Sequence, residues 1–447
     1  MWASGEMREM YFANKKLYLP LVGVIIGLIS VLFPQFIVIS VVIIITIIFA
    51  FYFITFNEKG KAFHIFRIFL IALTLRLVIC LLLSLISYFK RGHPFFLGCD
   101  DYRFSIDALG AAERWRKVGF VSVSDYLPCY GGDGYIYLLS LLFYFIGAYT
   151  FLPLFINCCL GALTIIFIYL ISKKIYNARV ASLAALLLSF WPSAVLWSTQ
   201  NLKETSAVFI VYLVFFLFSK FRGWLQDKKR LIYFLITLLP LALLAKIRSY
   251  MMVCLILSIV IAKLFFVTKK RLIFSLLGIV ILIMAFHQNW FYINDIFIYR
   301  FGISPIKIQF FELLNQYRYY RIQEGSTVFL PGLKIASLSS FILNSPIVLM
   351  YIFFAPFPWQ VFKASQLFAA IEMLIWYLLV IFAIRGFFIS MRYKLKESSP
   401  ILVFLVLSIF VLFVEGNVGA LFRHRYVIWP VLHIMISVGL FFHLEKE

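Results

Sequence analysis

Long apolar runs, separated by short polar turns, follow one another along almost the whole chain. Many of these runs reach the roughly 20 residues that a helix needs to cross a bilayer. Because lipid offers no hydrogen-bond partners, the backbone groups of each run must pair within a helix. The pattern predicts an all-α polytopic membrane protein with about 12 to 14 transmembrane helices. The clear spans are Leu17–Phe33, Gln35–Phe56, His64–Tyr88, Phe151–Ser172, Val180–Trp197, Thr205–Ser219, Leu231–Ala245, Met251–Val267, Leu272–Phe286, Leu367–Ile384, Ile401–Val414 and Tyr426–His443.

Two further apolar runs are ambiguous. Tyr135–Tyr149 is short for a span, and we favour a helix that lies in the membrane interface. Phe341–Phe357 ends in a proline-rich stretch through which no straight helix continues, which indicates re-entrant or interfacial structure. Whether either run crosses the bilayer stays open. Both totals are even, so both termini are predicted to lie on the same side.

The basic turns orient these spans. Lys173, Lys174 and Lys269 with their neighbours lie in turns that the positive-inside tendency places in the cytoplasm. Both termini are then cytoplasmic, and we expect a bacterial inner-membrane protein. The first run resembles a signal peptide, but no small-residue cleavage site follows it. We expect a two-helix anchor over residues 1–63 and a larger transmembrane domain over 64–447, with outer loops at about 90–134 and 287–340.

Composition supports the membrane assignment. The chain is 64% hydrophobic and only 13% charged, with a formal net charge of +22. In a polytopic protein this excess of Lys and Arg is explained by cytoplasmic turns, so it does not indicate a nucleic-acid partner. The basic residues predicted on the outer side are the informative ones.

Four polar groups of residues are predicted to meet at the outer face. Two adjacent acids, Asp100 and Asp101, open the first outer loop in a chain that has only 19 acidic residues. The other three groups place cations outside, against the positive-inside tendency, where a lipid head group or another phosphate would pair with them. They are Lys203 with Glu204, Lys246 with Arg248, and Arg423 with His424 and Arg425.

This combination suits transfer of a sugar from a lipid phosphate. A carboxylate can act as a general base towards a hydroxyl acceptor. Arg binds phosphate oxygens in pairs and Lys acts as a point charge, so both stabilise a phosphate leaving group. Asp100 and Asp101 are the catalytic candidates, and Lys203, Lys246, Arg248, Arg423 and Arg425 are candidates for binding the donor phosphate. Tyr102, Tyr130, Glu204, Asn417 and His424 are candidate substrate contacts.

Each candidate also has a structural alternative. Adjacent Asp residues often form turns or helix caps. Lys246 and Arg248 can anchor a helix end at lipid head groups, and Tyr side chains near span ends form interfacial belts. Arg76, inside the third span, is expected to have a structural role, paired with Glu372 or a lipid. A disulfide between Cys99 and Cys129 and two free thiols both remain open.

These residues resemble the GT-C superfamily of integral membrane glycosyltransferases, near glycosyltransferase family 39, which includes protein mannosyltransferases and aminoarabinose transferases. The resemblance is carried by Asp100-Asp101 after a span, by Leu160-Gly161-Ala162-Leu163-Thr164 through the turn at Lys173–Arg179, and by Trp197-Ser198 through Lys203-Glu204. The stretch from Gly416 to Arg425 is similar to a late outer loop of bacterial members. The resemblance covers about residues 64–445.

The resemblance implies an inverting enzyme that uses a polyprenyl-phosphate sugar donor and no nucleotide sugar. Asp100 or Asp101 would be the base, and the acceptor would be a cell-envelope glycolipid, polysaccharide or protein. No cofactor is required on this hypothesis, and a role for a divalent metal stays open. The two extra N-terminal spans are atypical of the family. We expect no large soluble C-terminal domain after the last span, which argues against an oligosaccharyltransferase-type member.

Two alternatives remain. A polysaccharide polymerase or ligase would use a polyprenyl diphosphate-linked glycan and would depend less on the acidic pair. A lipid or solute transporter would show paired halves with broken helices and charges near the bilayer midplane, whereas the charges here gather at span ends.

Overall fold

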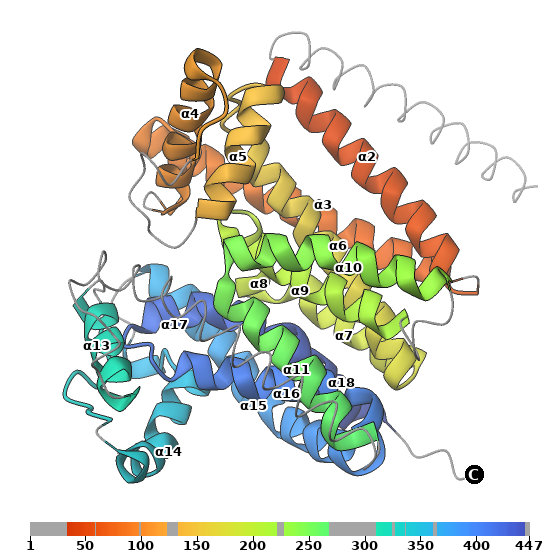
Figure 1. The fold of residues 1–447 in the computed structure, drawn as a ribbon, viewed down its shortest axis with the longest axis vertical. Coiled ribbons are helices and arrows are strands. Elements are labelled where there is room, and N and C mark those ends of the chain that lie inside the picture. The colour runs from red at the N-terminus through yellow and green to blue at the C-terminus, as the bar shows by residue number, and fades with distance from the viewer. Residues whose placement is uncertain are drawn as a thin grey trace, which may run out of the picture.

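The computed structural model describes residues 34–58, 60–97, 100–122, 133–220, 228–267, 310–323, 327–335, 337–360 and 364–442. The predicted spans at Leu17–Phe33 and Leu272–Phe286 lie outside these residues. The described chain is helical almost throughout, which confirms the prediction of an all-α membrane protein (Figure 1). Its helices are α2 (Pro34–Asn57), α3 (Ala62–Arg91), α4 (Asp100–Val118), α5 (Asp133–Phe145), α6 (Leu152–Ile175), α7 (Ala178–Phe190), α8 (Pro192–Ser198), α9 (Lys203–Lys220), α10 (Lys228–Ile247), α11 (Ser249–Val267), α13 (Phe310–Gln323), α14 (Leu338–Phe354), η4 (Pro358–Gln360), α15 (Ala364–Tyr393), α16 (Leu395–Leu412), α17 (Val418–His424), η5 (Arg425–Val427) and α18 (Trp429–Phe441).

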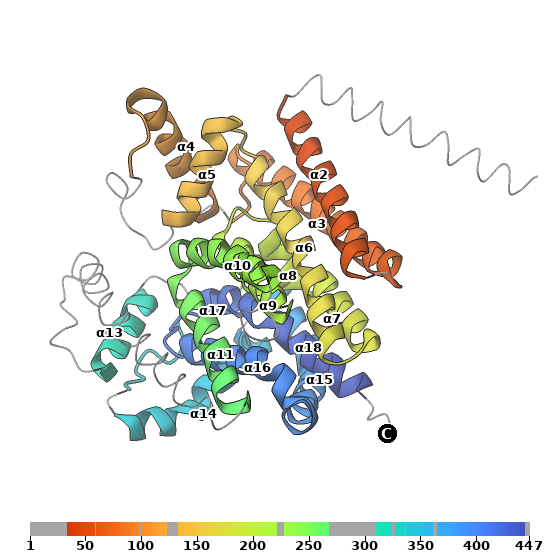
Figure 2. The same ribbon diagram turned by 45° about the vertical axis from the view of Figure 1, so that its right-hand side comes forward.

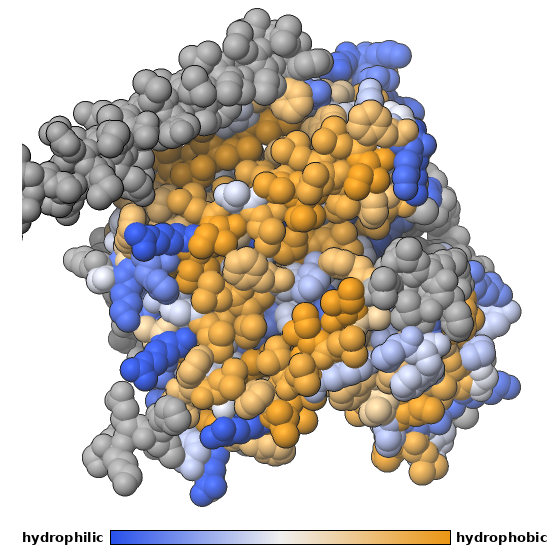
Figure 3. Space-filling view, turned by 180° about the vertical axis from the view of Figure 1, so that it is seen from behind, coloured by the Kyte–Doolittle hydropathy of each residue, from blue (hydrophilic) through white to orange (hydrophobic). Residues whose placement is uncertain are grey.

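Helix α6 lies at the centre of the N-terminal half. It packs against α2, α3, α7 and α9, and nearly every side chain from Leu152 to Ser172 is buried. Aromatic rings join the layers, since Phe167 packs against both Phe53 of α2 and Phe216 of α9. Hydrophobic side chains cover most of the face drawn in Figure 3, with hydrophilic residues at its edges, as expected of a surface that lies in lipid.

Helices α15 and α18 pack closely against each other in the C-terminal half. A Cβ atom built on Gly386 would lie 1.9 Å from the carbonyl oxygen of Met435, and one on Gly439 would lie 2.0 Å from that of Phe382. Small residues at such a crossing allow two membrane helices to approach until their backbones touch. Any side chain at either glycine would force α15 and α18 apart.

Length and composition identify candidate spans among the described helices. Five helices among the described residues, α2, α3, α6, α15 and α16, are long and apolar enough to cross a membrane, or up to seven if two bent pairs are counted. The run Val180–Trp197 is broken because Pro192 ends α7 and starts α8, which leaves at 61°. The run beginning at Tyr426 is bent by 65° before α18. Helix α5 has 13 residues and, at about 1.5 Å per residue, is too short to cross the hydrocarbon core.

Two parts of the chain frame the site. Helices α4 and α5 lie side by side at the top of Figures 1 and 2. The segment after α13 pairs with the chain before α17, where Phe329 N donates to Gly416 O at 3.0 Å and Val418 N donates to Thr327 O at 2.8 Å. This pairing ties residues 327–329 to the loop that carries Glu415 and Asn417.

Candidate active site

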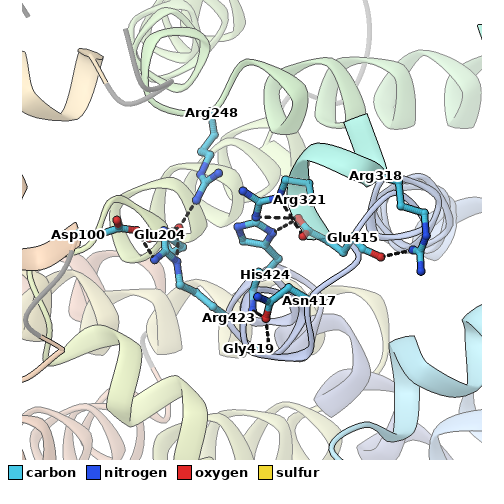
Figure 4. A network of polar contacts seen from close by, with 11 residues as sticks. Asp100, Glu204, Arg248, Arg318, Arg321, Glu415, Asn417, Gly419, Arg423 and His424 are labelled. Atoms are coloured by element: carbon cyan, nitrogen blue, oxygen red, sulfur yellow. Dashed lines mark hydrogen bonds and ion pairs between the residues drawn. The ribbon is translucent and has the colours of Figure 1, made fainter. Parts of the chain in front are cut away.

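Four separate parts of the chain converge on one polar cluster, drawn in Figure 4. They are the first turn of α4, the first turn of α9, the junction between α10 and α11, and the last turn of α17. They contribute Asp100, Glu204, Arg248 and Arg423, and we call these residues the central cluster. The structure thus brings together residues from all four groups that were predicted to meet outside.

Arg423 is the centre of this cluster. Its Nη1 donates to Asp100 Oδ2 at 2.6 Å, and its Nε donates to Glu204 Oε1 at 2.8 Å. Burial alone would lower the pKa of this guanidinium, but Glu204 and Asp100 reverse the effect and raise it. Arg423 is therefore a fixed cation that joins two carboxylates more than 100 residues apart in sequence.

Glu204 lies at the buried end of the cluster. Its Oε1 also accepts a hydrogen bond from Arg248, and only 2% of the Glu204 side chain is exposed. Burial alone would raise the pKa of Glu204, but Arg423, Arg248 and Lys203 lower it well below its usual range. Glu204 is thus an anion enclosed by cations, and the cations determine its charge.

Lys203 precedes Glu204 and is also buried. Its Nζ lies 5.5 Å from the ring centroid of Phe104, on the buried face of α4. Burial and the positive charge of Arg248 lower its pKa to about 7, against the opposing effect of Glu204 and Asp100. A small change of surroundings, such as a bound anion, would therefore change the charge of Lys203.

The two adjacent acids have different surroundings. The side chain of Asp100 is 50% exposed, whereas Asp101 is fully buried. Asp101 Oδ2 accepts from Leu97 N at 3.0 Å and its Oδ1 accepts from Tyr102 N at 2.9 Å, so this carboxylate fixes the loop that precedes α4. Its backbone carbonyl accepts from Asn201 Nδ2 at 2.9 Å. This geometry favours Asp100 for a base that meets a substrate and Asp101 for a structural role.

A second group of ion pairs, which the sequence analysis missed, extends the cluster. Glu415 accepts from Arg321 Nε at 3.1 Å and contacts His424 Nδ1 at 2.6 Å, and its backbone carbonyl accepts from Arg318 (Figure 4). Burial would raise the pKa of Glu415, but His424 and Arg321 lower it to about 2. The spacing of Arg318 and Arg321, one helical turn apart, and an acid at the end of an apolar run were the available signals.

Asn417 and His424 have structural partners. Asn417 Oδ1 caps α17 by accepting from Gly419 N at 2.8 Å, and it also accepts from Thr327 Oγ1 at 2.9 Å. His424 is held by Glu415, and burial lowers its pKa. These contacts fix the shape of the stretch from Gly416 to Arg425, the late loop, so that Arg423 meets Asp100.

Three predicted residues lie apart from the central cluster. Arg425 is buried, donates to the carbonyl of Ala355, and has its Nη1 3.2 Å from Met373 Sδ. Lys246 is exposed at the end of α10, where its backbone packs on Gly134. Tyr102 stacks on His93 with ring centroids 4.5 Å apart.

Arg76 is fully buried, and the structure does not pair it with Glu372, one of the two partners expected for it. Its guanidinium donates to the carbonyls of Ala72 at 3.1 Å and Ser189 at 3.3 Å, at the end of α7. Glu372 accepts instead from Ser193 Oγ at 2.9 Å. The buried arginine satisfies backbone groups that the break at Pro192 leaves free.

Some candidates fall outside the described residues, namely Tyr130, Cys99 and Cys129. Within the parts of the chain that the structure describes, no three His, Cys, Asp or Glu side chains are grouped as metal ligands. Asp100 and Glu204 are the two carboxylates of the central cluster, and Arg423 lies between them. The contacts of the central cluster therefore pair two carboxylates with two guanidinium groups.

Comparisons with known proteins show likenesses in sequence and in fold. The family model described as dolichyl-phosphate-mannose-protein mannosyltransferase matches residues 134–290. The Archaeoglobus fulgidus oligosaccharyltransferase in its apo form has a TM-score of 0.54 and 13% identity, covering 86% of this chain and 51% of that one. The oligosaccharyltransferase AglB of the same organism, in complex with an inhibitory peptide and a dolichol-phosphate, has a TM-score of 0.49 and 15% sequence identity. That match covers 85% of this chain and 50% of AglB.

The chain therefore spans about half the length of these solved structures. No curated protein matches it. The likeness to the apo oligosaccharyltransferase is one of fold alone. The expectation that this chain is not an oligosaccharyltransferase-type member therefore stays a prediction.

Proposed function

We propose that this multi-pass membrane protein, whose resemblance to the GT-C superfamily is supported by the family match and the shared fold, is a glycosyltransferase. It takes a sugar from a polyprenyl phosphate and transfers it to a cell-envelope acceptor at the extracytoplasmic face of the bacterial inner membrane. The acceptor is a hydroxyl-bearing glycolipid, polysaccharide or protein.

One observation supports the proposal: the half-exposed carboxylate of Asp100 and the buried carboxylate of Glu204 share one guanidinium partner, Arg423. Asp100 lies 2.6 Å from Arg423, and Arg248 and Lys203 surround the adjacent Glu204. Such a site offers a base on its open side and positive charge on its closed side. Those are the two groups needed to activate a hydroxyl and to stabilise a departing phosphate.

The reaction is a single displacement. The acceptor hydroxyl gives its proton to Asp100 Oδ as its oxygen bonds to the anomeric carbon. The bond from that carbon to the phosphate oxygen breaks, and the electron pair leaves with the polyprenyl phosphate, which Arg423, Arg248 and Lys203 stabilise. Attack from the side opposite the phosphate inverts the anomeric centre.

The position of the cluster favours a lipid-linked donor. Its cations lie at the ends of α9, α10 and α17, beside helices whose outward surfaces are apolar. Cations at the level of lipid head groups bind a phosphate that is carried on an acyl or prenyl chain without drawing it out of the membrane. A sugar donor anchored in the same bilayer then meets Asp100 from the side of the membrane.

The proposal is tested by mass spectrometry of lipids that co-purify with the protein in mild detergent. A second polytopic protein from the same membranes serves as the reference. We expect enrichment of a polyprenyl phosphate or its glycosylated form. Enrichment of a polyprenyl diphosphate bearing several sugars would replace the proposal with a polymerase or ligase, and bulk phospholipid alone would remove the donor assignment.

We expect donor affinity to fall as the pH rises through about 7. Lys203, whose pKa is lowered to about 7, is a cation below that pH and becomes neutral above it, next to the fixed charges of Arg248, Arg423 and Glu204. A sugar phosphodiester keeps its charge across this range. The donor KM should therefore rise by roughly tenfold between pH 6 and 9, since a desolvated charge contact is worth about that factor.

The comparison variant for this pH profile is Lys203→Met. It should show a high donor KM at pH 6 and little further change with pH. A Lys203→Met profile that keeps the full pH dependence would mean that another group causes it.

A further inference from the structure

Glu204 has an unusual set of contacts for a residue in a substrate site. One oxygen, Oε1, accepts from Arg423 Nε at 2.8 Å, lies 2.8 Å from Arg423 Nη2, and accepts from Arg248. The other oxygen, Oε2, is buried and has no hydrogen-bond partner among the described residues. A buried carboxylate oxygen that accepts hydrogen bonds from two guanidinium groups fixes the position of both.

The guanidinium of Arg423 has two different ends. Its Nε and Nη2 face Glu204, whose side chain is 2% exposed, and its Nη1 faces Asp100, whose side chain is 50% exposed. An ion pair open to water is weaker and more easily exchanged than one enclosed in protein. The Glu204 contact is therefore the lasting one, and the Asp100 contact is the one that a ligand can replace.

We propose that Glu204 is a positioning residue that holds Arg423 from its buried side, so that Nη1 of Arg423 can pass between Asp100 and the phosphate of the donor. This inference rests on the proposed function. Arg248 also donates to Glu204, so Arg248, Glu204 and Arg423 form a chain of ion pairs (Figure 4). This chain ends at Nη1 of Arg423, the nitrogen that can exchange its partner. Donor binding then frees Asp100 from its ion pair, and the base becomes available only when a donor is present.

The inference predicts opposite effects for two carboxylates that bind the same guanidinium. Asp100 competes with the phosphate for Nη1, so Asp100→Asn should leave phosphate binding unchanged or make it tighter. Glu204 holds Arg423 in place, so Glu204→Gln should weaken binding by about tenfold, since a misplaced guanidinium loses its paired contact with phosphate oxygens. A purely electrostatic role would instead make Glu204→Gln bind phosphate more tightly, because removing any negative charge near a phosphate favours its binding.

Glu204→Asp separates position from charge. The shorter side chain keeps the negative charge but cannot reach the same place, so a positioning role predicts weaker binding and a charge role predicts no change. Asp107→Asn is the matched control, because Asp107 lies on the same helix as Asp100 and pairs only loosely with Arg103 at 3.7 Å. It should bind as the wild type does.

The experiment measures binding of undecaprenyl phosphate to the full-length protein in detergent micelles, with thermal unfolding recorded for each variant. Weaker binding by both Glu204 variants supports the inference. Tighter binding by Glu204→Gln, or unchanged binding by Glu204→Asp, overturns it while the proposed function stands. If Glu204→Gln does not fold, Glu204→Asp decides the question alone. No binding by the wild type overturns the donor assignment and the inference with it.

Discussion

Asp100→Asn should lower kcat for sugar transfer by about 10³-fold, within the range expected for loss of a general base. The carboxylate is the half-exposed acid of the central cluster, and its amide cannot accept a proton from the acceptor. Asn keeps the size of the side chain and can still accept one hydrogen bond from Arg423. The protein should therefore fold, and steady-state transfer from a polyprenyl-phosphate sugar should show a loss in kcat with little change in donor KM.

The neighbouring acid provides the comparison for this experiment. Asp101→Asn weakens the contacts to Leu97 N and Tyr102 N, so it should cost about 1 to 2 kcal/mol of stability. The folded fraction should still transfer sugar. Full activity of Asp100→Asn would contradict its assignment as the base, and full activity of both variants would exclude a catalytic role for the acidic pair.

Arg423→Gln should reduce kcat/KM for the donor by about 10²- to 10³-fold, the usual loss when one fixed donor to a developing anion is removed. Arg423 hydrogen-bonds to both Asp100 and Glu204. Its loss removes the cation that would face the leaving phosphate. Lipids that co-purify with this variant should lack the enriched polyprenyl phosphate of the wild type.

The other arginine of the late loop separates this effect from a general loss of positive charge. Arg425 faces Ala355 and Met373, so Arg425→Gln should lower the thermal unfolding temperature and leave co-purified polyprenyl phosphate in place. Loss of the lipid in Arg425→Gln, with retention in Arg423→Gln, would exchange the roles of the two residues.

The sequence by itself determined the membrane class and identified candidate residues for the site. Apolar runs of this length can satisfy their backbone groups in lipid only as helices. Cations that oppose the positive-inside tendency, together with two acids in an acid-poor chain, identified Asp100, Lys203, Arg248 and Arg423 before any contact between them was known. These conclusions depend on composition and on distance along the chain, which the sequence contains.

The tertiary structure decided which way each side chain points. Consecutive helical residues differ by about 100°, so Asp100 faces Arg423 while Asp101 faces the loop behind it. Arg423 and Arg425, two residues apart, differ by about twice that angle and reach opposite surroundings. The apolar pattern contains no such information, because a polar residue between two spans has no periodicity from which its direction can be predicted.

The same limit explains the pairs that the sequence missed or misassigned. Glu204 meets Arg423 across 219 residues, and Glu415 meets Arg321 across 94. Arg76 binds the carbonyls at the end of α7, because Pro192 breaks the following run and leaves those groups unpaired. Which charges neutralise one another depends on how bent helices pack, and that packing is a property of the whole fold.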